Sequence, residues 1–367
     1  MSICILVISD YRAFHSARPE AEIFVDLAGR GYDIHIMTYG DSAYARRFRE
    51  HGIQVIDWHP RKKFNKEEID RIRETLLRLK PDVLHLFNNE GIVNGLRAAR
   101  GLPVKVVLYR GYAGNIHWWD PSAYAKFLHP RVDRIICNAK GVEEVFHRQW
   151  FFDRSKALTI HKGHDLSWYA GYRPEAIRTQ LGIPENALLL VNVAMNRRMK
   201  GIPYLIKAMN LLPREADIHL LLIGRNMDNR ENLNLIRLGH QQDHIHILGF
   251  RKEPMNIVAA CDAFVLSSIK GESLTMSVIE AIAVGVAPVI TDIPGNRKLV
   301  VDKVGGLVVP PRDPVALSEA IMTLYHDRSL LDKFARNARQ HIQDNINHDQ
   351  TVEAMDAFYR ELVNDKS

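Results

Sequence analysis

Short apolar runs alternate with longer amphipathic stretches along the whole chain. The apolar runs are rich in Val, Leu and Ile, whereas the longer stretches repeat their apolar positions at helical spacing. Buried parallel strands and the helices that cover them produce this pattern. In the first half it predicts strands at residues 3–9, 32–39, 82–87, 104–109 and 133–139, and helices at 19–31, 66–80 and 139–150.

The second half repeats this order of strands and helices. Its predicted strands are 187–194, 217–224, 245–250, 263–268 and 287–292, and its predicted helices are 202–212, 232–242, 254–261, 275–285 and 313–327. The alternation predicts an α/β protein built from two Rossmann-like domains in series. We expect the first at residues 1–165 and the second at 166–349, with a final helix at about 350–367 that crosses back to the first.

Composition agrees with a globular protein that has two cores. The 367 residues are 46% hydrophobic and 25% charged. Three scattered cysteines favour buried thiols in a reducing compartment over a disulfide framework. The first apolar run ends at Asp10 and lacks the features of a signal peptide, and no run reaches the roughly 18 apolar residues of a membrane span. We therefore expect a cytoplasmic protein that is at most peripheral on the inner face of the membrane.

The net charge of +6 falls within residues 1–165. It is concentrated at 45–50, 59–66 and 71–80. A basic face of this kind could meet an anionic membrane surface or an anionic acceptor, although ordinary solvated helix faces are the simpler explanation. Nucleic acid is not expected as a partner, because no aromatic ladder or binding motif accompanies the basic residues.

Two glutamates eight positions apart, Glu272 and Glu280, mark the most informative segment, residues 271–295. The first lies in a predicted loop, a helix begins between them, and the second lies about one turn into that helix. A helix start offers free N–H groups to phosphate, and carboxylates accept hydrogen bonds from hydroxyls. The segment therefore predicts a site for a ligand that carries both groups, such as a nucleotide sugar.

Several segments together are similar to the glycosyltransferases of family 4, which have the GT-B fold. The matching segments are GHDLSWY (163–169), 196–209, 244–250, 260–268, 271–295 and GGLVVPPRDPVALSEAI (305–321). The resemblance implies two Rossmann-like domains that face each other across a cleft. It also implies transfer of a sugar from a nucleotide-diphosphate donor to an acceptor hydroxyl, with retention at the anomeric carbon.

The resemblance assigns the donor to the second domain. Glu280 is expected to bind the ribose hydroxyls, and Glu272 to lie near the donor sugar. The amides that lead into the helix would face the diphosphate, and the hydroxyls among these residues could cap the helix. The amides belong to Ser273, Leu274, Thr275 and Met276.

Two basic residues are expected to neutralise the leaving diphosphate. These are Arg197 and Lys200, with Arg198 as a rival to Arg197. Met195 stands where relatives often have an arginine. No D-x-D motif and no His/Cys cluster at ligand spacing is visible, so we expect neither a metal nor another cofactor.

The nucleotide base is expected where predicted strands of the second domain end. Ligands of open parallel sheets bind beyond the carboxyl ends of the strands. This rule points to Gly249, Phe250 and Arg251 after one strand and to Gly224 after another.

The first domain is expected to bind the acceptor. Arg110, Gly111 and His117 follow a predicted strand, and Arg18 belongs to the stretch after the first strand. The chain lacks the Gly-Gly loop of many relatives at residues 9–22, and Arg110 stands where they often have histidine. Arg18 could equally lie on a surface loop. Trp118 and Trp119 could stack on a sugar, anchor at a membrane or pack in the core.

The resulting hypothesis is a metal-independent, retaining glycosyltransferase. Its acceptor would be a glycan, a lipid-linked glycan or a small molecule, with cell-envelope polysaccharide synthesis as the expected setting. The main alternative is a catalytically silent GT-B subunit that binds nucleotide sugar or glycan. A nucleotide-sugar epimerase is a weaker alternative. A dehydrogenase is disfavoured because no G-x-G-x-x-G follows the first strand.

Overall fold

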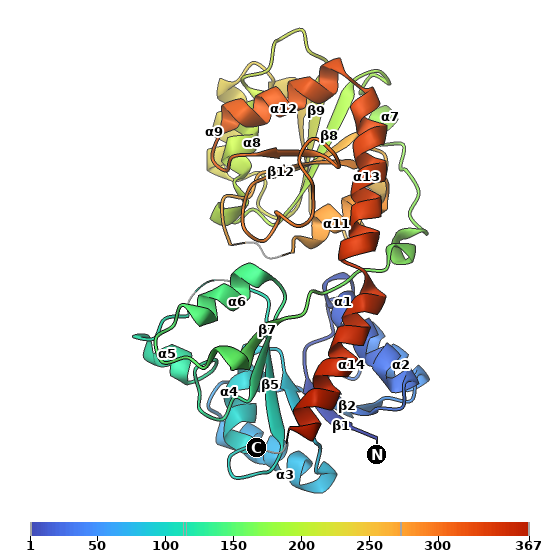
Figure 1. The fold of residues 1–367 in the computed structure, drawn as a ribbon. Coiled ribbons are helices and arrows are strands. Elements are labelled where there is room, and N and C mark those ends of the chain that lie inside the picture. The colour runs from blue at the N-terminus through green and yellow to red at the C-terminus, as the bar shows by residue number, and fades with distance from the viewer. Residues whose placement is uncertain (1, 113, 115, 272–273, 366–367) are drawn as a thin grey trace. The chain divides into compact units, whose positions relative to one another are not determined.

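The computed structural model describes residues 2–112, 114, 116–271 and 274–365. The chain forms two compact units (Figure 1). Unit 1 comprises residues 1–163 and 346–367, and unit 2 comprises residues 164–345. Over the described ranges no helix is long and apolar enough to cross a membrane. The boundary between the two units lies two residues before the expected one, and residues 346–367 belong to unit 1 again.

Unit 1 is built on a seven-stranded parallel sheet in the order β3-β2-β1-β4-β5-β6-β7. The strands are β1 Cys4–Ile8, β2 Asp33–Thr38, β3 Gln54–Asp57, β4 Val83–Leu86, β5 Lys105–Arg110, β6 Arg134–Cys137 and β7 Ala157–Thr159. The helices are α1 Phe14–Gly29, α2 Ala43–Glu50, α3 Lys66–Leu79, α4 Asn89–Ala98, α5 Pro121–Tyr124, α6 Lys140–His147 and α14 His348–Asn364. Alternate residues of β1 enter two separate cores, one with α1 and α14 and one with α3, α4 and α6.

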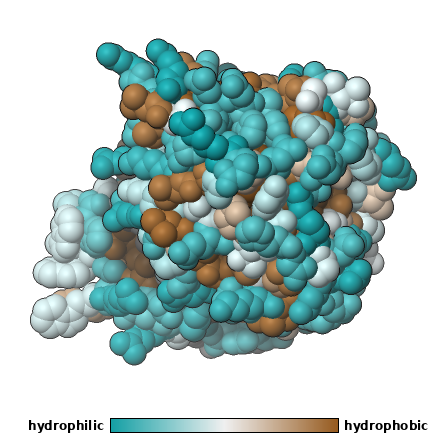
Figure 2. Space-filling model, turned by 90° about the horizontal axis from the view of Figure 1, so that it is seen from above, coloured by the Kyte–Doolittle hydropathy of each residue, from teal (hydrophilic) through white to brown (hydrophobic). Residues whose placement is uncertain are grey.

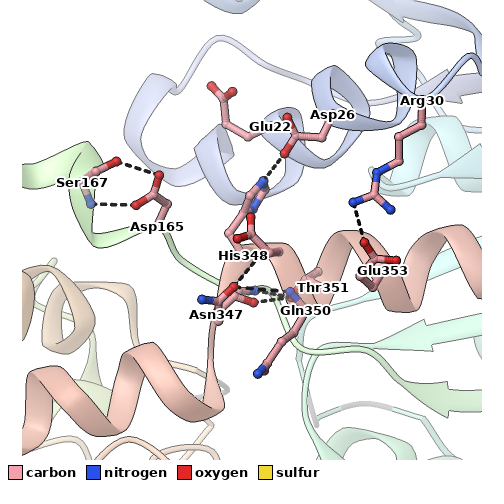
Figure 3. Close-up of polar contacts among 12 residues, drawn as sticks. Glu22, Asp26, Arg30, Asp165, Ser167, Asn347, His348, Gln350, Thr351 and Glu353 are labelled. Atoms are coloured by element: carbon pink, nitrogen blue, oxygen red, sulfur yellow. Dashed lines mark hydrogen bonds and ion pairs between the residues drawn. The ribbon is translucent and has the colours of Figure 1, made fainter.

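The last helix, α14, completes unit 1 (Figure 3). The side chains of Val352, Phe358 and Tyr359 belong to the core that α1 shares. Polar contacts also join α14 to α1, with His348 Nε2 at 2.7 Å from Asp26 Oδ2 and Arg30 Nη2 at 2.8 Å from a carboxylate oxygen of Glu353. The return of the final helix to the first domain is therefore a structural feature of the chain.

Helix α1 begins five residues earlier than the sequence pattern predicts. The prediction began the helix at Pro19, but this residue lies inside the helix. Phe14 explains the early start, because its ring stacks on that of Tyr44 with centroids 4.9 Å apart. Packing between helices thus outweighs the hydrogen bond that the proline cannot donate. As a result Arg18 lies on a helix rather than on a surface loop.

Unit 2 is built on a six-stranded parallel sheet in the order β10-β9-β8-β11-β12-β13. The strands are β8 Leu188–Val193, β9 Ile218–Ile223, β10 Ile245–Gly249, β11 Ala263–Leu266, β12 Ala287–Thr291 and β13 Leu307–Val309. The helices are α7 Ile177–Leu181, α8 Ile202–Met209, α9 Arg230–Leu238, α10 Met255–Val258, α11 Met276–Ala283, α12 Pro314–His326 and α13 Ser329–Asn345. Helices α8, α9 and α12 enclose one core against the sheet.

Charged and polar side chains dominate the surface seen in Figure 2, where hydrophobic residues form separate small groups. The apolar strand residues lie inside, because most residues of β8, β9, β11 and β12 are buried. Each unit thus has its own core, and the residues available for chemistry are those at strand ends and on the loops that follow them.

Candidate functional site

The carboxyl ends of β8, β9 and β11 in unit 2 hold one loop in place, here called the Lys200 loop (residues 194–201). Asn196 N donates to Arg225 O at 3.1 Å, and Asn196 Nδ2 donates to Asn226 O at 2.6 Å. These bonds tie the start of the loop to the end of β9. Both contacts are accepted by backbone carbonyls after β9, so the end of this strand and the side chain of Asn196 together fix the start of the loop.

The second half of the Lys200 loop is tied to the end of β11. Ile269 N donates to Met199 O at 2.7 Å, and Ser267 Oγ donates to Lys200 O at 3.0 Å. Gly201 follows with a φ of +66°, and a Cβ there would stand 2.0 Å from the carbonyl oxygen of Ser267. Only glycine permits this approach. Lys200 is thereby positioned from two strands at once.

The Lys200 loop lines a groove of about 970 Å³ on unit 2. Arg197 and Arg198 are both exposed and both line it, so the structure does not separate the predicted arginine from its rival. Lys200 and Glu280 are not among the described residues of the lining. The charged residues of the lining are Arg197, Arg198, Lys207, Glu231, Lys270 and Arg312. A surface with this excess of positive charge attracts anions.

The glycines predicted for base binding lie side by side. Gly224 N donates to Gly249 O at 2.9 Å, at the ends of β9 and β10. Gly224 has a φ of +147°, and a Cβ there would stand 1.7 Å from Ala194 O, so this position requires glycine. The backbone at the end of β9 is therefore in contact with Ala194, the first residue of the Lys200 loop.

An exposed aromatic ring continues this strand end. Phe250 is 59% exposed, and the guanidinium carbon of Arg225 lies 4.7 Å from the centre of its ring. Arg251 is also exposed. An exposed flat ring backed by a cation is suited to stacking with a planar ligand.

Helix α11 carries the second glutamate of the predicted pair. Glu280 is half-buried on this helix, whose neighbouring residues Val278 and Ile279 are buried. Met276 begins the helix and is half-buried, whereas Leu274 is buried before it. Glu272 and Ser273, which were predicted to bind the donor, lie outside the described residues.

Thr275 occupies the N-cap of α11 but does not cap it with its side chain. Its hydroxyl instead donates to Asn296 Oδ1 at 2.7 Å, so the expectation that it caps the helix is wrong. Asn296 is fully buried, and its Nδ2 has no hydrogen-bond partner within the described part of the chain. Sequence reasoning missed Asn296, although it directly follows the quoted segment 271–295.

Arg110 holds the loop after β5. Its Nε donates to Tyr112 O at 2.7 Å, its Nη2 donates to Gly114 O, and its guanidinium carbon lies 4.7 Å from the ring centre of Phe127. Burial lowers the pKa of this arginine below its usual value. The contacts commit two of its nitrogens to backbone carbonyls, so it shapes the loop. At Gly111 a Cβ would approach the Tyr109 ring to 3.2 Å.

The remaining residues predicted for the acceptor lie on other elements. His117 is exposed and stacks on Trp119 with ring centres 4.7 Å apart. Trp118 and Trp119 are both exposed, which excludes the core-packing alternative for them. Arg18 lies on α1, with its guanidinium carbon 4.7 Å from the ring centre of Phe14.

A buried ion pair that sequence reasoning missed lies at the carboxyl ends of the strands of unit 1. Lys162 Nζ is 2.8 Å from Glu20 Oε2 and 4.2 Å from the ring centre of Tyr109, while Ser9 Oγ donates to Glu20 Oε1 at 2.7 Å. Burial opposes the charge of Lys162, but Glu20 and Tyr109 outweigh it and raise the pKa of this lysine. A usable signal was present, since Lys162 directly precedes the quoted GHDLSWY motif.

The ion pair borders a small cavity of about 20 Å³. His85 lies in its wall, with Nδ1 at 2.6 Å from the hydroxyl of Tyr359 on α14, and burial lowers the pKa of this histidine to about 3. A cavity of this size holds about one water molecule. It is too small for a sugar, so it is not a candidate for the acceptor site.

Two family patterns match the chain and together cover most of it. The pattern described as Glycosyltransferase Family 4 matches residues 22–168. The pattern described as Glycosyl transferases group 1 matches residues 174–341. The two matches correspond to unit 1 and unit 2.

Two curated relatives illustrate the sequence similarity. One is an uncharacterised glycosyltransferase of Methanocaldococcus jannaschii, 24% identical over 71% of this chain and 66% of the relative, just under two thirds of its length. The other, from Escherichia coli, is named UDP-Gal:α-D-GlcNAc-diphosphoundecaprenol α-1,3-galactosyltransferase. It is 25% identical over 78% of this chain and 77% of the relative.

A solved structure shows the same fold. HepE of Anabaena in complex with UDP has a TM-score of 0.78 at 18% identity, over 98% of this chain and all of the HepE chain. The predicted GT-B fold is thereby confirmed. With both family patterns matched in order and this fold in each unit, the chain belongs to family 4 of the glycosyltransferases and is a transferase enzyme.

Proposed function

We propose that this protein transfers a sugar, with retention at the anomeric carbon, from a nucleoside diphosphate sugar to an acceptor hydroxyl. The observation that carries the proposal is the Lys200 loop, which backbone hydrogen bonds hold against β9 and β11 beside a basic groove. Such a loop presents positive charge where a departing diphosphate gains negative charge. The E. coli relative is named for a UDP-galactose donor, and HepE was solved with UDP, so a UDP-sugar is the donor proposed first.

Arg197 and Lys200 are proposed to stabilise the leaving diphosphate. A hydrogen bond to a charged group contributes about 1.5–3 kcal/mol, which corresponds to a rate factor of roughly 10 to 150. The diphosphate held in this way would take the proton of the attacking hydroxyl. Because these two cations and the start of α11 supply positive potential, no metal is proposed for the transfer step.

The nucleoside is proposed to lie between Glu280 and the strand ends. Glu280 would accept hydrogen bonds from the ribose hydroxyls. The base would stack on Phe250 beside the adjacent backbones of Gly224 and Gly249. Glu272 would contact the donor sugar, as in the family motif.

The acceptor is proposed to bind unit 1 and to be anionic, as a lipid-linked glycan with phosphate would be. Arg12 is exposed near the ends of β1 and β2, with its guanidinium carbon 3.9 Å from the ring centre of Tyr39. It pairs with Asp10 at 2.7 Å, so an anionic acceptor would have to replace that carboxylate as its partner. The name of the E. coli relative contains such an acceptor, a diphosphoundecaprenol-linked sugar. Synthesis of cell-envelope polysaccharide is the corresponding role.

An aromatic patch on unit 1 supports peripheral contact with a membrane. It consists of Trp118, Trp150 and Phe151, which are all exposed. The rings of Trp150 and Phe151 stack with centres 5.3 Å apart, and Trp118 meets Trp150 at 6.3 Å. Tryptophan and phenylalanine side chains of this kind insert at the level of lipid headgroups, and basic segments add attraction to anionic lipid.

The test is release of nucleoside diphosphate from a panel of UDP-, GDP- and ADP-sugars, with and without a lipid-linked acceptor. We expect Arg197→Ala and Lys200→Ala to lower kcat roughly 10- to 100-fold while UDP still binds, because the lost charge acts mainly on the leaving group. Glu280→Ala should chiefly weaken UDP binding in calorimetry.

Arg214→Ala is the matched control, because Arg214 is an exposed arginine of unit 2 outside the groove. It should behave like the unaltered protein. Release from no donor by the unaltered protein, together with tight UDP binding, would instead favour the catalytically silent subunit.

A further inference from the structure

We propose that Cys4, Asp33 and His35 form a binding site for one transition-metal ion, with Zn²⁺ as the expected ion. One ligand atom of each residue, the thiol sulfur, a carboxylate oxygen and an imidazole nitrogen, lies within 4.8 Å of the other two. The site lies in unit 1 and shares no residue with the proposed donor or acceptor sites. Nothing in the proposed transfer reaction uses it.

The parallel sheet brings these side chains together. Cys4 of β1 and Asp33 of β2 are directly paired in the register, so their side chains leave the same face of the sheet. His35 lies two residues further along β2 and therefore shares that face. The three residues lie at the amino ends of β1 and β2, which are neighbours in the sheet (Figure 1).

The distances suit a small tetrahedral ion. His35 Nε2 lies 3.2 Å from Asp33 Oδ1. Ligands about 2.0–2.2 Å from zinc at tetrahedral angles stand roughly 3.4 Å from each other. An ion between imidazole and carboxylate would thus need little movement, and the thiol lies within reach as third ligand.

The donor set selects the kind of ion. Thiolate and imidazole are soft or borderline ligands that favour zinc, cobalt and related metals over magnesium and calcium. A carboxylate completes sets of this kind in known zinc sites. Three protein ligands leave the fourth position to water.

A second carboxylate, that of Asp82, lies next to the proposed site but is not one of its three ligands. Asp82 Oδ2 accepts a hydrogen bond from Cys4 N at 2.8 Å, so it fixes the backbone that carries the thiol. It also adds negative charge near the proposed ion. Cys4 and His35 are half-buried and Asp33 is exposed, which gives an ion a path from solvent while the sulfur stays partly shielded.

The position of the site indicates what the ion would do. It lies at the amino ends of β1 and β2, whereas Ser9 and the Lys162–Glu20 pair lie beyond the carboxyl ends of their strands. An ion there would join β1 and β2, two neighbouring interior strands of the seven-stranded sheet. It would stabilise unit 1 and leave the transfer step free of metal.

The experiment uses the full chain, stripped with a chelator and then titrated with Co²⁺ and Zn²⁺. We expect one Co²⁺ to bind with the near-ultraviolet charge-transfer band of a thiolate–cobalt bond and the strong visible bands of tetrahedral cobalt. Zn²⁺ should displace it and raise the unfolding temperature. In Cys4→Ser the charge-transfer band should vanish, and His35→Gln should weaken binding at least 10-fold.

Cys261→Ser is the matched control, because that cysteine is buried in unit 2, and it should bind cobalt like the unaltered protein. Thermal unfolding of the metal-free variants and their UDP binding verify that each variant is folded. Cobalt binding without a charge-transfer band would overturn the proposal, and so would a cobalt affinity of Cys4→Ser and His35→Gln equal to that of the unaltered protein. So would an unfolding temperature of the unaltered protein that zinc does not change.

Discussion

At the scale of single residues, unit 1 depends on a buried charge pair. Lys162 and Glu20 come from opposite ends of the unit 1 sequence and meet at 2.8 Å, with Ser9 and Tyr109 as further neighbours of the pair. Each charge is desolvated, and each is balanced by the other. Removing one partner alone is therefore strongly destabilising, because it leaves the other charge buried without compensation.

Lys162→Met should lower the free energy of unfolding of unit 1 by about 3–5 kcal/mol, since Glu20 is then left buried without its cation. Glu20→Gln should cost a similar amount. The double variant should cost clearly less than the sum of the two single variants, because neither buried charge remains. Chemical denaturation followed by circular dichroism measures the three values. Additive losses would show that the two side chains do not interact.

At the scale of elements, the hydrophobic pattern predicted the strands that the two cores require. All five strands expected in each half are present, because each buries a run of apolar side chains. The pattern missed β3, β7 and β13, which have only three or four residues each. Length alone does not explain this, because β4, β6 and β11 have four residues each and were predicted. The three missed strands are sheet edges that bury fewer side chains, so their sequences carry a weaker hydrophobic signal.

The candidate site was predicted unevenly for a related reason. The rule on strand ends pointed to Gly224 and Gly249, which lie side by side at the ends of β9 and β10, whereas the family resemblance pointed to Arg197 and Lys200. Asn296 and Lys162 were missed, because their importance comes from partners distant in sequence, Thr275 and Glu20 respectively. Sequence reasoning also did not bring Cys4 and Asp33 together, since only the pairing of parallel strands makes them neighbours.

The edge of the unit 2 sheet contains a group of histidines. The Nδ1 atom of His219 on β9 shares a hydrogen bond of 3.0 Å with the Nε2 atom of His246 on β10. The Nε2 atom of His219 lies 3.1 Å from Asp217 Oδ1. His244 stacks on His219 with ring centres 4.3 Å apart. Burial and the neighbouring His244 and His246 lower the pKa of His219 to about 4.

We expect unit 2 to lose stability as the pH falls from about 6.5 to about 4. His219 has a lower pKa in the folded than in the unfolded chain, so protons bind the unfolded chain first and favour it. Above pH 6.5 this histidine is neutral in both states and the contribution is fully present. Thermal unfolding between pH 8 and pH 4 measures the effect. His219→Gln should flatten the profile, and an unchanged profile would contradict the assignment to His219.

At the scale of the whole molecule, charge and exposed aromatic rings occur in the same unit. The excess positive charge falls within residues 1–165, and Trp150 and Phe151 are the most exposed aromatic side chains of the described chain. The positive charge alone, or the exposed rings alone, would have ordinary explanations. Together they match the two forces that hold a peripheral protein at an anionic bilayer, electrostatic attraction and shallow insertion of rings.

The protein should therefore co-sediment with vesicles that contain anionic lipid, and less with neutral vesicles or at high salt. Replacing Trp150 and Phe151 together by alanine should reduce binding roughly 10-fold or more, because two large rings no longer insert. Leu238→Ala is the control, since Leu238 is an equally exposed apolar residue in unit 2. Equal binding by the double variant and the control would show that the rings do not contact lipid.

The return of α14 to unit 1 has a consequence for biosynthesis. The first 163 residues leave the ribosome well before α14, yet Tyr359 and Phe358 belong to their core. At roughly 5–20 residues per second, the intervening segment delays α14 by about 10 to 40 s. During this time the apolar face of α1 lacks the helix that covers it, whereas all of unit 2 is synthesised as one continuous segment. The second domain can therefore finish folding before the first, and the nascent chain offers chaperones a defined apolar face until its last helix is made.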